Sequence, residues 1–180
     1  MKSPNLALTL QRDIEATLIP SGVKVTLVAG HQVYVTQALG NAYTLQINGN
    51  LVRINGADGD AIGLPILEVV DINTIDGSLE HKVWAQLKTC FDPEIPVNIV
   101  DLGLIYECET IPAEKNLHHI QIVMTLTAPG CGMGPVLVEE IKDKVQQIHG
   151  VAAVQVELVF EPPWDRSRMS DEAKLQLGLF

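Results

Sequence analysis

The sequence has 180 residues, enough for one ordinary domain or two small ones, and 47% of them are hydrophobic. The formal net charge of -10 argues against a surface that binds nucleic acid and against a polybasic membrane patch. No stretch approaches the ~18 consecutive apolar residues of a membrane span. Residues 1–20 have only short apolar runs and early charges, unlike a secretory signal peptide. We therefore expect a cytoplasmic protein whose partners are neither nucleic acid nor membrane.

The first half of the chain is a series of short, β-branched and roughly alternating segments. Gly and Asn turns separate four of them, which are residues 24–29, 31–39, 42–48 and 51–56. The turn at Asn48-Gly49, between two alternating runs, is the sharpest hairpin signal. Residues 56–65, "GADGDAIGLP", are expected to form a boundary loop. This half predicts a β-rich domain over residues 1–70, folded as a small barrel or sandwich.

The second half changes its hydrophobic period. The expected elements are a helix capped by Ser78, strands over 100–110 and 119–127, a helix starting at Pro135 and a strand over 151–160. The first two strands pair antiparallel through their short turn, and the crossover helix places the last strand parallel to the second one. Both helices then cover one face of the sheet. The sequence predicts a two-layer α+β domain of the order helix-strand-strand-helix-strand over 71–180, which includes a C-terminal tail.

Two details of this domain can also be predicted. Charged residues of the second helix lie largely outside its apolar stripe; they are Glu139, Glu140, Lys142, Asp143 and Lys144. In the tail, Ser170 should cap a last short helix, and Trp164 should pin the tail to the domain.

The loop "TAPGCGMGP", residues 127–135, places Cys131 among glycines just before the second helix. Exposed amide groups and the positive end of a helix dipole stabilise a thiolate, which makes such a cysteine reactive or metal-binding. A small buried hydrophobe in a tight turn is the alternative, and the residues alone leave both open. Cys108 is expected to pack in the core, and Cys90, at the end of a helix, is expected to have a structural role. Three widely spaced cysteines argue against a zinc site closed by this chain and against a disulfide framework.

Three polar residues accompany this cysteine in our list of candidates. Asp92 begins the proline-framed segment "DPEIP", where its carboxylate could serve either a site or plain turn chemistry. Thr125 and Thr127 lie on the strand face opposite the apolar stripe and lead toward Cys131, and strand propensity alone would also explain them.

Three segments together resemble a known family. They are "DPEIPVNIVDLGLIYECE" (92–109), "MTLTAPGCGMGPVLVEEIKDKV" (124–145) and "GVAAVQVELVFEPPWDRSRMSDEAKLQLG" (150–178). Their order and separation resemble the SufT family of iron–sulfur assembly proteins, which is related to a component of the eukaryotic cytosolic iron–sulfur targeting machinery. The resemblance implies that Cys131 is the family's characteristic cysteine, that Asp92 is its acidic loop residue, and that Thr125 and Thr127 line the same site.

The resemblance also implies a function. The protein is expected to be an accessory factor in iron–sulfur cluster assembly, not an enzyme, with Cys131 as a transient, shared ligand for iron or a cluster. Because a cluster has about four protein ligands, this chain alone should hold no cofactor tightly. The expected partners are iron–sulfur assembly proteins and apo client proteins, and a homo-oligomer is left open. The alternatives are a non-catalytic subunit of a multicomponent oxygenase and a thiol enzyme with Cys131 as its nucleophile.

Overall fold

The computed structural model describes residues 7–179, so residues 1–6 of the N-terminal stretch considered above lie outside the described part. Internal contacts divide the chain into two compact units, Met1–Val69 and Val70–Phe180, and each is described here by itself. Among the described residues, no helix has the length and apolar character that crossing a bilayer requires. The secondary structure is mixed α+β, with a β-rich first unit, as the sequence predicts.

The first unit contains one antiparallel sheet with the strand order β1-β4-β5-β6-β2-β3. The strands are β1 (Ala7–Thr9), β2 (Ile14–Ile19), β3 (Lys24–Leu27), β4 (Gln32–Leu39), β5 (Ala42–Ile47) and β6 (Asn50–Asn55). Among the described residues, β1 and β3 are its two edges, so the sheet does not close into a barrel through their pairing. Alternating side chains such as Val33, Leu45 and Val52 are fully buried and form a core of their own.

The hairpin predicted at Asn48-Gly49 is confirmed. Ile47 of β5 pairs directly with Asn50 of β6, which leaves a two-residue turn. Both turn residues have positive φ, 49° at Asn48 and 80° at Gly49. Asn and Gly tolerate this left-handed geometry best, and its twist matches that of the flanking strands.

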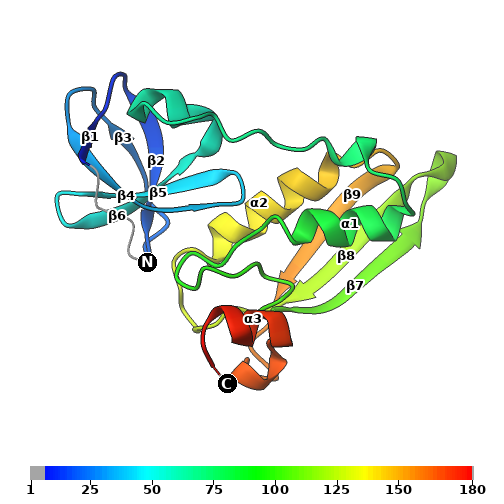
Figure 1. Cartoon of the computed structure of the whole chain (residues 1–180). Coiled ribbons are helices and arrows are strands. Elements are labelled where there is room, and N and C mark those ends of the chain that lie inside the picture. The colour runs from blue at the N-terminus through cyan, green and yellow to red at the C-terminus, as the bar shows by residue number, and fades with distance from the viewer. Residues whose placement is uncertain (1–6, 180) are drawn as a thin grey trace. The chain divides into compact units, whose positions relative to one another are not determined.

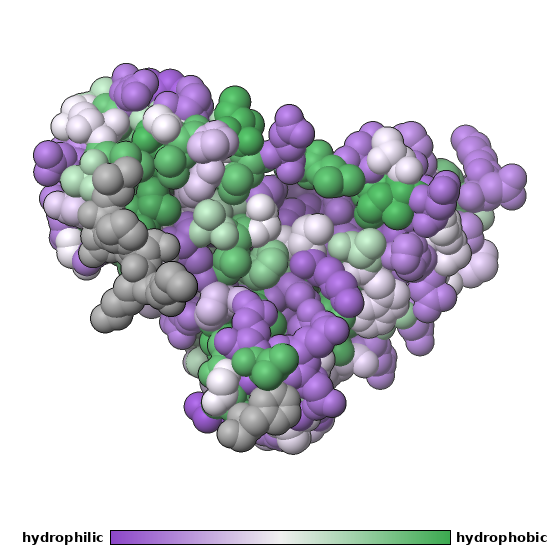
Figure 2. All heavy atoms as spheres, viewed as in Figure 1, coloured by the Kyte–Doolittle hydropathy of each residue, from purple (hydrophilic) through white to green (hydrophobic). Residues whose placement is uncertain are grey.

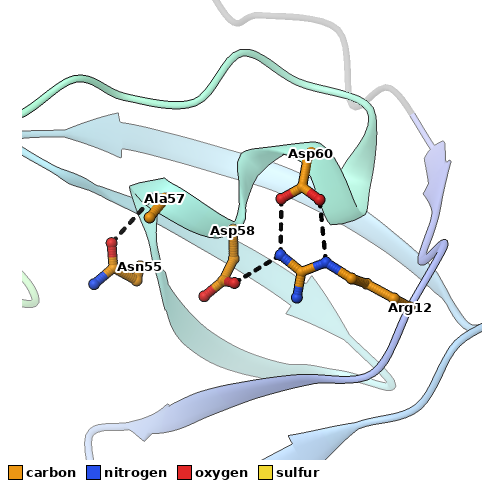
Figure 3. Close-up of polar contacts among 5 residues, drawn as sticks. All are labelled: Arg12, Asn55, Ala57, Asp58 and Asp60. Carbon is orange, nitrogen blue, oxygen red and sulfur yellow. Dashed lines mark hydrogen bonds and ion pairs between the residues drawn. The ribbon is translucent and has the colours of Figure 1, made fainter.

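The segment expected as a boundary loop forms the 3₁₀ helix η1 (Gly56–Ile62). The guanidinium group of Arg12, which follows β1, hydrogen-bonds to this helix (Figure 3). It donates to both carboxylate oxygens of Asp60, at 3.1 and 2.8 Å, and to Asp58 at 2.8 Å. The bidentate bond from Arg12 holds the pKa of the Asp60 carboxyl below its usual range. This ordered helix explains why "GADGDAIG" is no simple linker.

The second unit has the predicted order of elements. These are α1 (Leu79–Leu87), β7 (Ile105–Pro112), β8 (His118–Met124), α2 (Gly134–Gln146) and β9 (Val151–Leu158). β7 pairs antiparallel with β8, and β9 pairs parallel with β8, as expected. Figure 1 shows α1 and α2 together on one face of this three-stranded sheet. The Ser78 side chain caps α1 by accepting a bond from the His81 amide at 3.2 Å, which confirms the predicted cap.

The strand predicted over 100–110 is wrong at its start, because β7 begins only at Ile105. The Leu102 amide bonds the Asn98 carbonyl at 3.0 Å, and Gly103 has φ 72°, so the preceding residues form a tight turn. Apolar residues of this turn are still buried: Leu102 and Leu104 have no exposed surface. Alternation of hydrophobic residues therefore indicated burial correctly and strand geometry wrongly.

The tail after β9 packs back on this turn. It contains the short helices η4 (Arg166–Arg168) and α3 (Asp171–Gln176), and Ser170 caps α3 as predicted. The Trp164 indole N–H donates to the Leu102 carbonyl at 2.7 Å, which confirms that this side chain pins the tail. An added Cβ at Gly103 would lie 2.2 Å from the Arg168 carbonyl oxygen, so only glycine permits this close approach. The Gln176 side chain adds a bond of 2.9 Å to the Pro96 carbonyl.

Candidate functional site

Asp92 lies in the proline-framed segment after α1. Only 6% of this residue is exposed. Its Oδ1 accepts bonds from the amides of Glu94 and Ile95, both at 2.9 Å, which closes the turn around Pro93. A bond of 3.2 Å from the Asp92 amide to the Val97 carbonyl closes the segment from the other side. The turn chemistry considered from sequence is therefore present, and it fixes the carboxylate in one orientation.

The second carboxylate oxygen of Asp92 faces the end of β8. The Thr127 hydroxyl lies 3.4 Å from Oδ2 and donates a hydrogen bond to it. This bond links two segments 35 residues apart in the chain. Burial raises the pKa of the Asp92 carboxyl, and the bonds from Ile95, Glu94 and Thr127 oppose that rise because they favour the charged form. The structure thus brings together two of the predicted site residues.

Thr125 has a different environment. It is 1% exposed, and its amide donates to the Leu104 carbonyl at 2.9 Å, which continues the β7–β8 pairing beyond Met124. No hydrogen bond joins it to Asp92 in the described part of the chain. Its position indicates a role in holding the turn before β7, and its place in a ligand site stays a prediction.

Cys131 lies four residues beyond Thr127, in the turn that leads into α2. Gly130 has φ 77°, so the turn uses the left-handed geometry expected of its glycines. The Cys131 carbonyl accepts a bond from the Gly134 amide at 3.1 Å, and α2 starts at Gly134, one residue before the predicted Pro135. The side chain of Cys131 is half-buried and packs against the edge of the core. Since the N-cap residue Met133 offers no side-chain acceptor, the first turn of α2 has no side-chain cap.

The other two cysteines lie in the packed interior. Cys90 is fully buried, and Cys108 is half-buried against the same core. Burial, followed by the charge of Glu80, raises the pKa of the Cys108 thiol to about 11. The Cys108 thiol is therefore protonated at neutral pH in the absence of a metal ion.

The donor set of this region is small. No group of three or more His, Cys, Asp or Glu side chains is placed to hold a metal ion within residues 7–179. Likewise, no hydrogen bond among the described residues joins Cys131 to Asp92 or to either threonine. One sulfur is too few to close an iron–sulfur site within this chain, because clusters need several thiolates.

A pocket of about 500 Å³ opens beside Asp92 and Thr127, and our sequence analysis missed it. Three segments form it, with the following lining residues: Glu94, Ile95, Pro96, Thr127, Ala128, Trp164, Arg166, Met169, Leu177 and Leu179. The only sequence signals for it were Pro93 and Pro96, which follow Asp92, and the tryptophan in the tail. Neither indicates a pocket until the tail is folded back on the domain.

Comparisons with known proteins match the region just described. The sequence pattern of the family described as "Iron-sulfur cluster assembly protein" matches residues 80–158. An "Fe-S protein maturation auxiliary factor" from Porphyromonas gingivalis is 42% identical over 99 residues, which cover 55% of this chain and 90% of that protein. The "Fe-S protein maturation auxiliary factor SufT" of Staphylococcus aureus is 35% identical over 88 residues, which cover 49% and 96%.

A solved structure agrees with these sequence matches. The crystal structure of a domain of unknown function from Bacillus anthracis is 37% identical, with a TM-score of 0.50. The similarity covers 57% of this chain and 93% of that one. The family match over residues 80–158 contains Asp92, Thr127 and Cys131. This chain belongs to the iron–sulfur cluster assembly protein family that includes the SufT maturation factors.

Proposed function

We propose that this protein is an accessory factor in the maturation of iron–sulfur proteins and presents Cys131 as a soft, shared ligand for iron or a cluster in transit. The observation that carries the proposal is the site itself: a half-buried thiol on a glycine turn, close in sequence to the threonine that bonds a buried aspartate. Membership of the iron–sulfur assembly family and relatives named auxiliary factors support it.

The site favours transfer over storage. Thiolates are good ligands for iron–sulfur clusters, and a complete cluster has about four protein ligands. Cys131 supplies one of them, so the others must come from a client protein, from an assembly protein or from a second copy of this chain. Incomplete ligation makes the cargo easy to pass on. In this proposal Asp92 and Thr127 orient the loop and the incoming partner, and neither catalyses a reaction.

Replacement of Cys131 in the source cell tests this proposal. We expect Cys131→Ala and Cys131→Ser to lower the activities of iron–sulfur enzymes several-fold, while cluster-free enzymes of the same pathways keep theirs. Cys108→Ala is the matched control, since burial keeps that thiol protonated, and it should resemble wild type. Equal losses in both groups of enzymes, or no loss with Cys131→Ala, would contradict the assembly function.

Anaerobic reconstitution of the purified protein adds a direct measurement. Wild type is expected to take up substoichiometric iron and sulfide with charge-transfer absorption bands, and Cys131→Ala should lose these bands. If both proteins show the same spectrum, Cys131 is not a ligand.

A further inference from the structure

The pocket beside Asp92 has a composition suited to an apolar guest. Apolar side chains from all three segments line it, among them Ile95, Trp164 and Leu177. Its volume of about 500 Å³ lies within the usual range of ligand pockets and is enough for two aliphatic side chains. Figure 2 shows hydrophobic surface over α3, the helix that precedes Leu177 and Leu179, and Leu175 of this helix is 71% exposed.

Charged side chains of both signs lie on the rim of the pocket. Arg166 lines it, and no ion pair engages this guanidinium within residues 7–179. The lack of an ion pair at Arg166 is unusual in a chain with 22 acidic and 12 basic residues. An Arg side chain without a carboxylate partner is suited to take one from a ligand, preferably in bidentate geometry. Glu94 also lines the pocket and disfavours a polyanion such as a phosphate chain.

The pocket is continuous with the candidate site. Thr127 lines the pocket and also donates its hydroxyl to Asp92. Glu94 and Ile95 line the pocket with their side chains, while their amides hold Asp92. A molecule held in the pocket therefore lies against the same two segments that position the buried carboxylate.

One wall of the pocket comes from the C-terminal tail. Trp164, Arg166, Met169 and the leucines of the tail form it. Bonds from Trp164 to Leu102 and from Gln176 to Pro96 fix this wall in place. The wall is therefore preformed.

We propose that this pocket docks an extended peptide segment of a client protein, with two aliphatic side chains inside and a carboxylate paired with Arg166. This inference rests on the proposed function, because it names the kind of partner that the site receives. In an extended peptide, alternate side chains point the same way and lie about 6.6 Å apart. Two leucines at alternate positions fill the pocket, and an aspartate two positions further on reaches the rim.

Fluorescence titration of the full chain tests the proposal. The indole of Trp164 lines the pocket, and a Trp84→Phe background leaves it as the single tryptophan reporter. The probe is the synthetic peptide acetyl-Leu-Ser-Leu-Ser-Asp-Ser-amide, compared with versions that carry Lys for Asp or Ser for both Leu residues. We expect saturable binding of the first peptide and about tenfold weaker binding of the other two.

Three variants give the test its specificity. Arg166→Glu reverses the exposed rim charge and should weaken the first peptide about tenfold while it improves the Lys peptide. Ala128→Phe fills the pocket from an exposed position and should weaken every peptide. Lys115→Gln is the matched control, because Lys115 lies in the exposed turn between β7 and β8, and it should bind like the parent protein.

Several results would overturn the docking proposal. The first is no saturable change in Trp164 fluorescence at millimolar peptide. The second is equal affinity of Arg166→Glu and its parent protein for the first peptide. The third is self-association of the protein that Ala128→Phe abolishes, without any peptide binding. The last result would assign the pocket to a second copy of this chain. If the peptides fail to bind while Cys131→Ala still impairs iron–sulfur enzymes in the cell, only the docking inference is wrong. If Cys131→Ala has no effect there, the proposed function is wrong whatever the peptides do.

Discussion

Asp92 is a buried carboxylate that has hydrogen bonds but no salt bridge among the described residues. Two backbone amides and one hydroxyl bond it, and yet desolvation raises the pKa of its carboxyl. A charge held in this way costs free energy of folding at neutral pH, because the unfolded chain hydrates it fully. Such a cost at a single residue is typical of a site maintained for function.

The raised pKa has a consequence that stability measurements can check. Because the pKa of Asp92 is higher in the folded than in the unfolded protein, the folded protein binds the proton more tightly. The contribution of Asp92 to stability is therefore largest in acid. It falls as the pH rises through the unfolded-state pKa and then the folded-state pKa of Asp92. Asp92→Asn keeps the acceptor for both amides and removes the charge. We expect it to raise the midpoint of urea unfolding at pH 7.5 relative to wild type, with the difference shrinking toward pH 4, near the ordinary pKa of about 3.9.

Urea unfolding at the two pH values, followed by circular dichroism, measures this difference. Thr127→Val provides a control at the same site, because it keeps the carboxyl and removes one bond to it. A lower midpoint for Asp92→Asn at both pH values would show that the charge stabilises the fold.

At this scale, sequence reasoning identified Asp92, Thr127 and Cys131 as candidates, and it did so through resemblance to a family. It could not predict that Thr127 bonds Asp92, since the two residues meet only after the sheet has formed. It also could not predict the burial of Asp92, because an Asp-Pro-Glu segment is equally compatible with an exposed turn.

Helices α1 and α2 are joined by a polar bridge that their sequence pattern did not indicate. The sequence places Lys144 outside the apolar stripe of α2, yet only 8% of the residue is exposed. Its ammonium group donates to the Thr89 carbonyl at 2.8 Å and pairs with Glu140 at 2.8 Å, while the Gln86 side chain donates to the Lys144 carbonyl at 3.0 Å. A helical period shows which face is apolar, but not which polar residue a neighbouring helix covers.

Substitution in this bridge should therefore weaken the unit. Lys144→Met is expected to cost about 1.5–3 kcal/mol of unfolding free energy, because it leaves the Thr89 carbonyl without the charged donor. Lys142→Met is the matched control on the same helix; among the described residues its ammonium pairs only with Glu139, at 3.2 Å, and it is exposed, so a change within about 0.5 kcal/mol is expected. Equal losses in the two variants, measured by chemical denaturation, would refute the bridge.

Other elements followed directly from local chemistry. The caps at Ser78 and Ser170, the Asn48-Gly49 hairpin and the parallel pairing of β8 with β9 were all predicted, because each depends on nearby residues or on general rules of handedness. The start of β7 was not predicted. It depends on a tail more than 50 residues later, which contacts Gly103 and Leu102, and no residue near the turn indicates that contact.

The whole molecule consists of two compact units, each with its own hydrophobic core. All candidate site residues and the complete pocket lie in the second unit. We therefore expect residues 70–180 alone to fold, to show a cooperative thermal transition and to bind the leucine-containing peptide within about threefold of the full chain. Calorimetry and the fluorescence titration measure both properties. A fragment without a transition would show that the first unit is needed for folding.

The parallel pairing of β9 and the return of the tail also fix an order of events during translation. The first unit is synthesised completely before any strand of the second sheet, and domains generally fold as they emerge. The turn that precedes β7 is stabilised last, because Trp164 and Gln176, which bond this region, are synthesised after all the strands. Cys131 is therefore synthesised before the pocket beside Asp92 and Thr127 can form, and under the docking proposal competence to receive a partner arises only once synthesis has passed the tail.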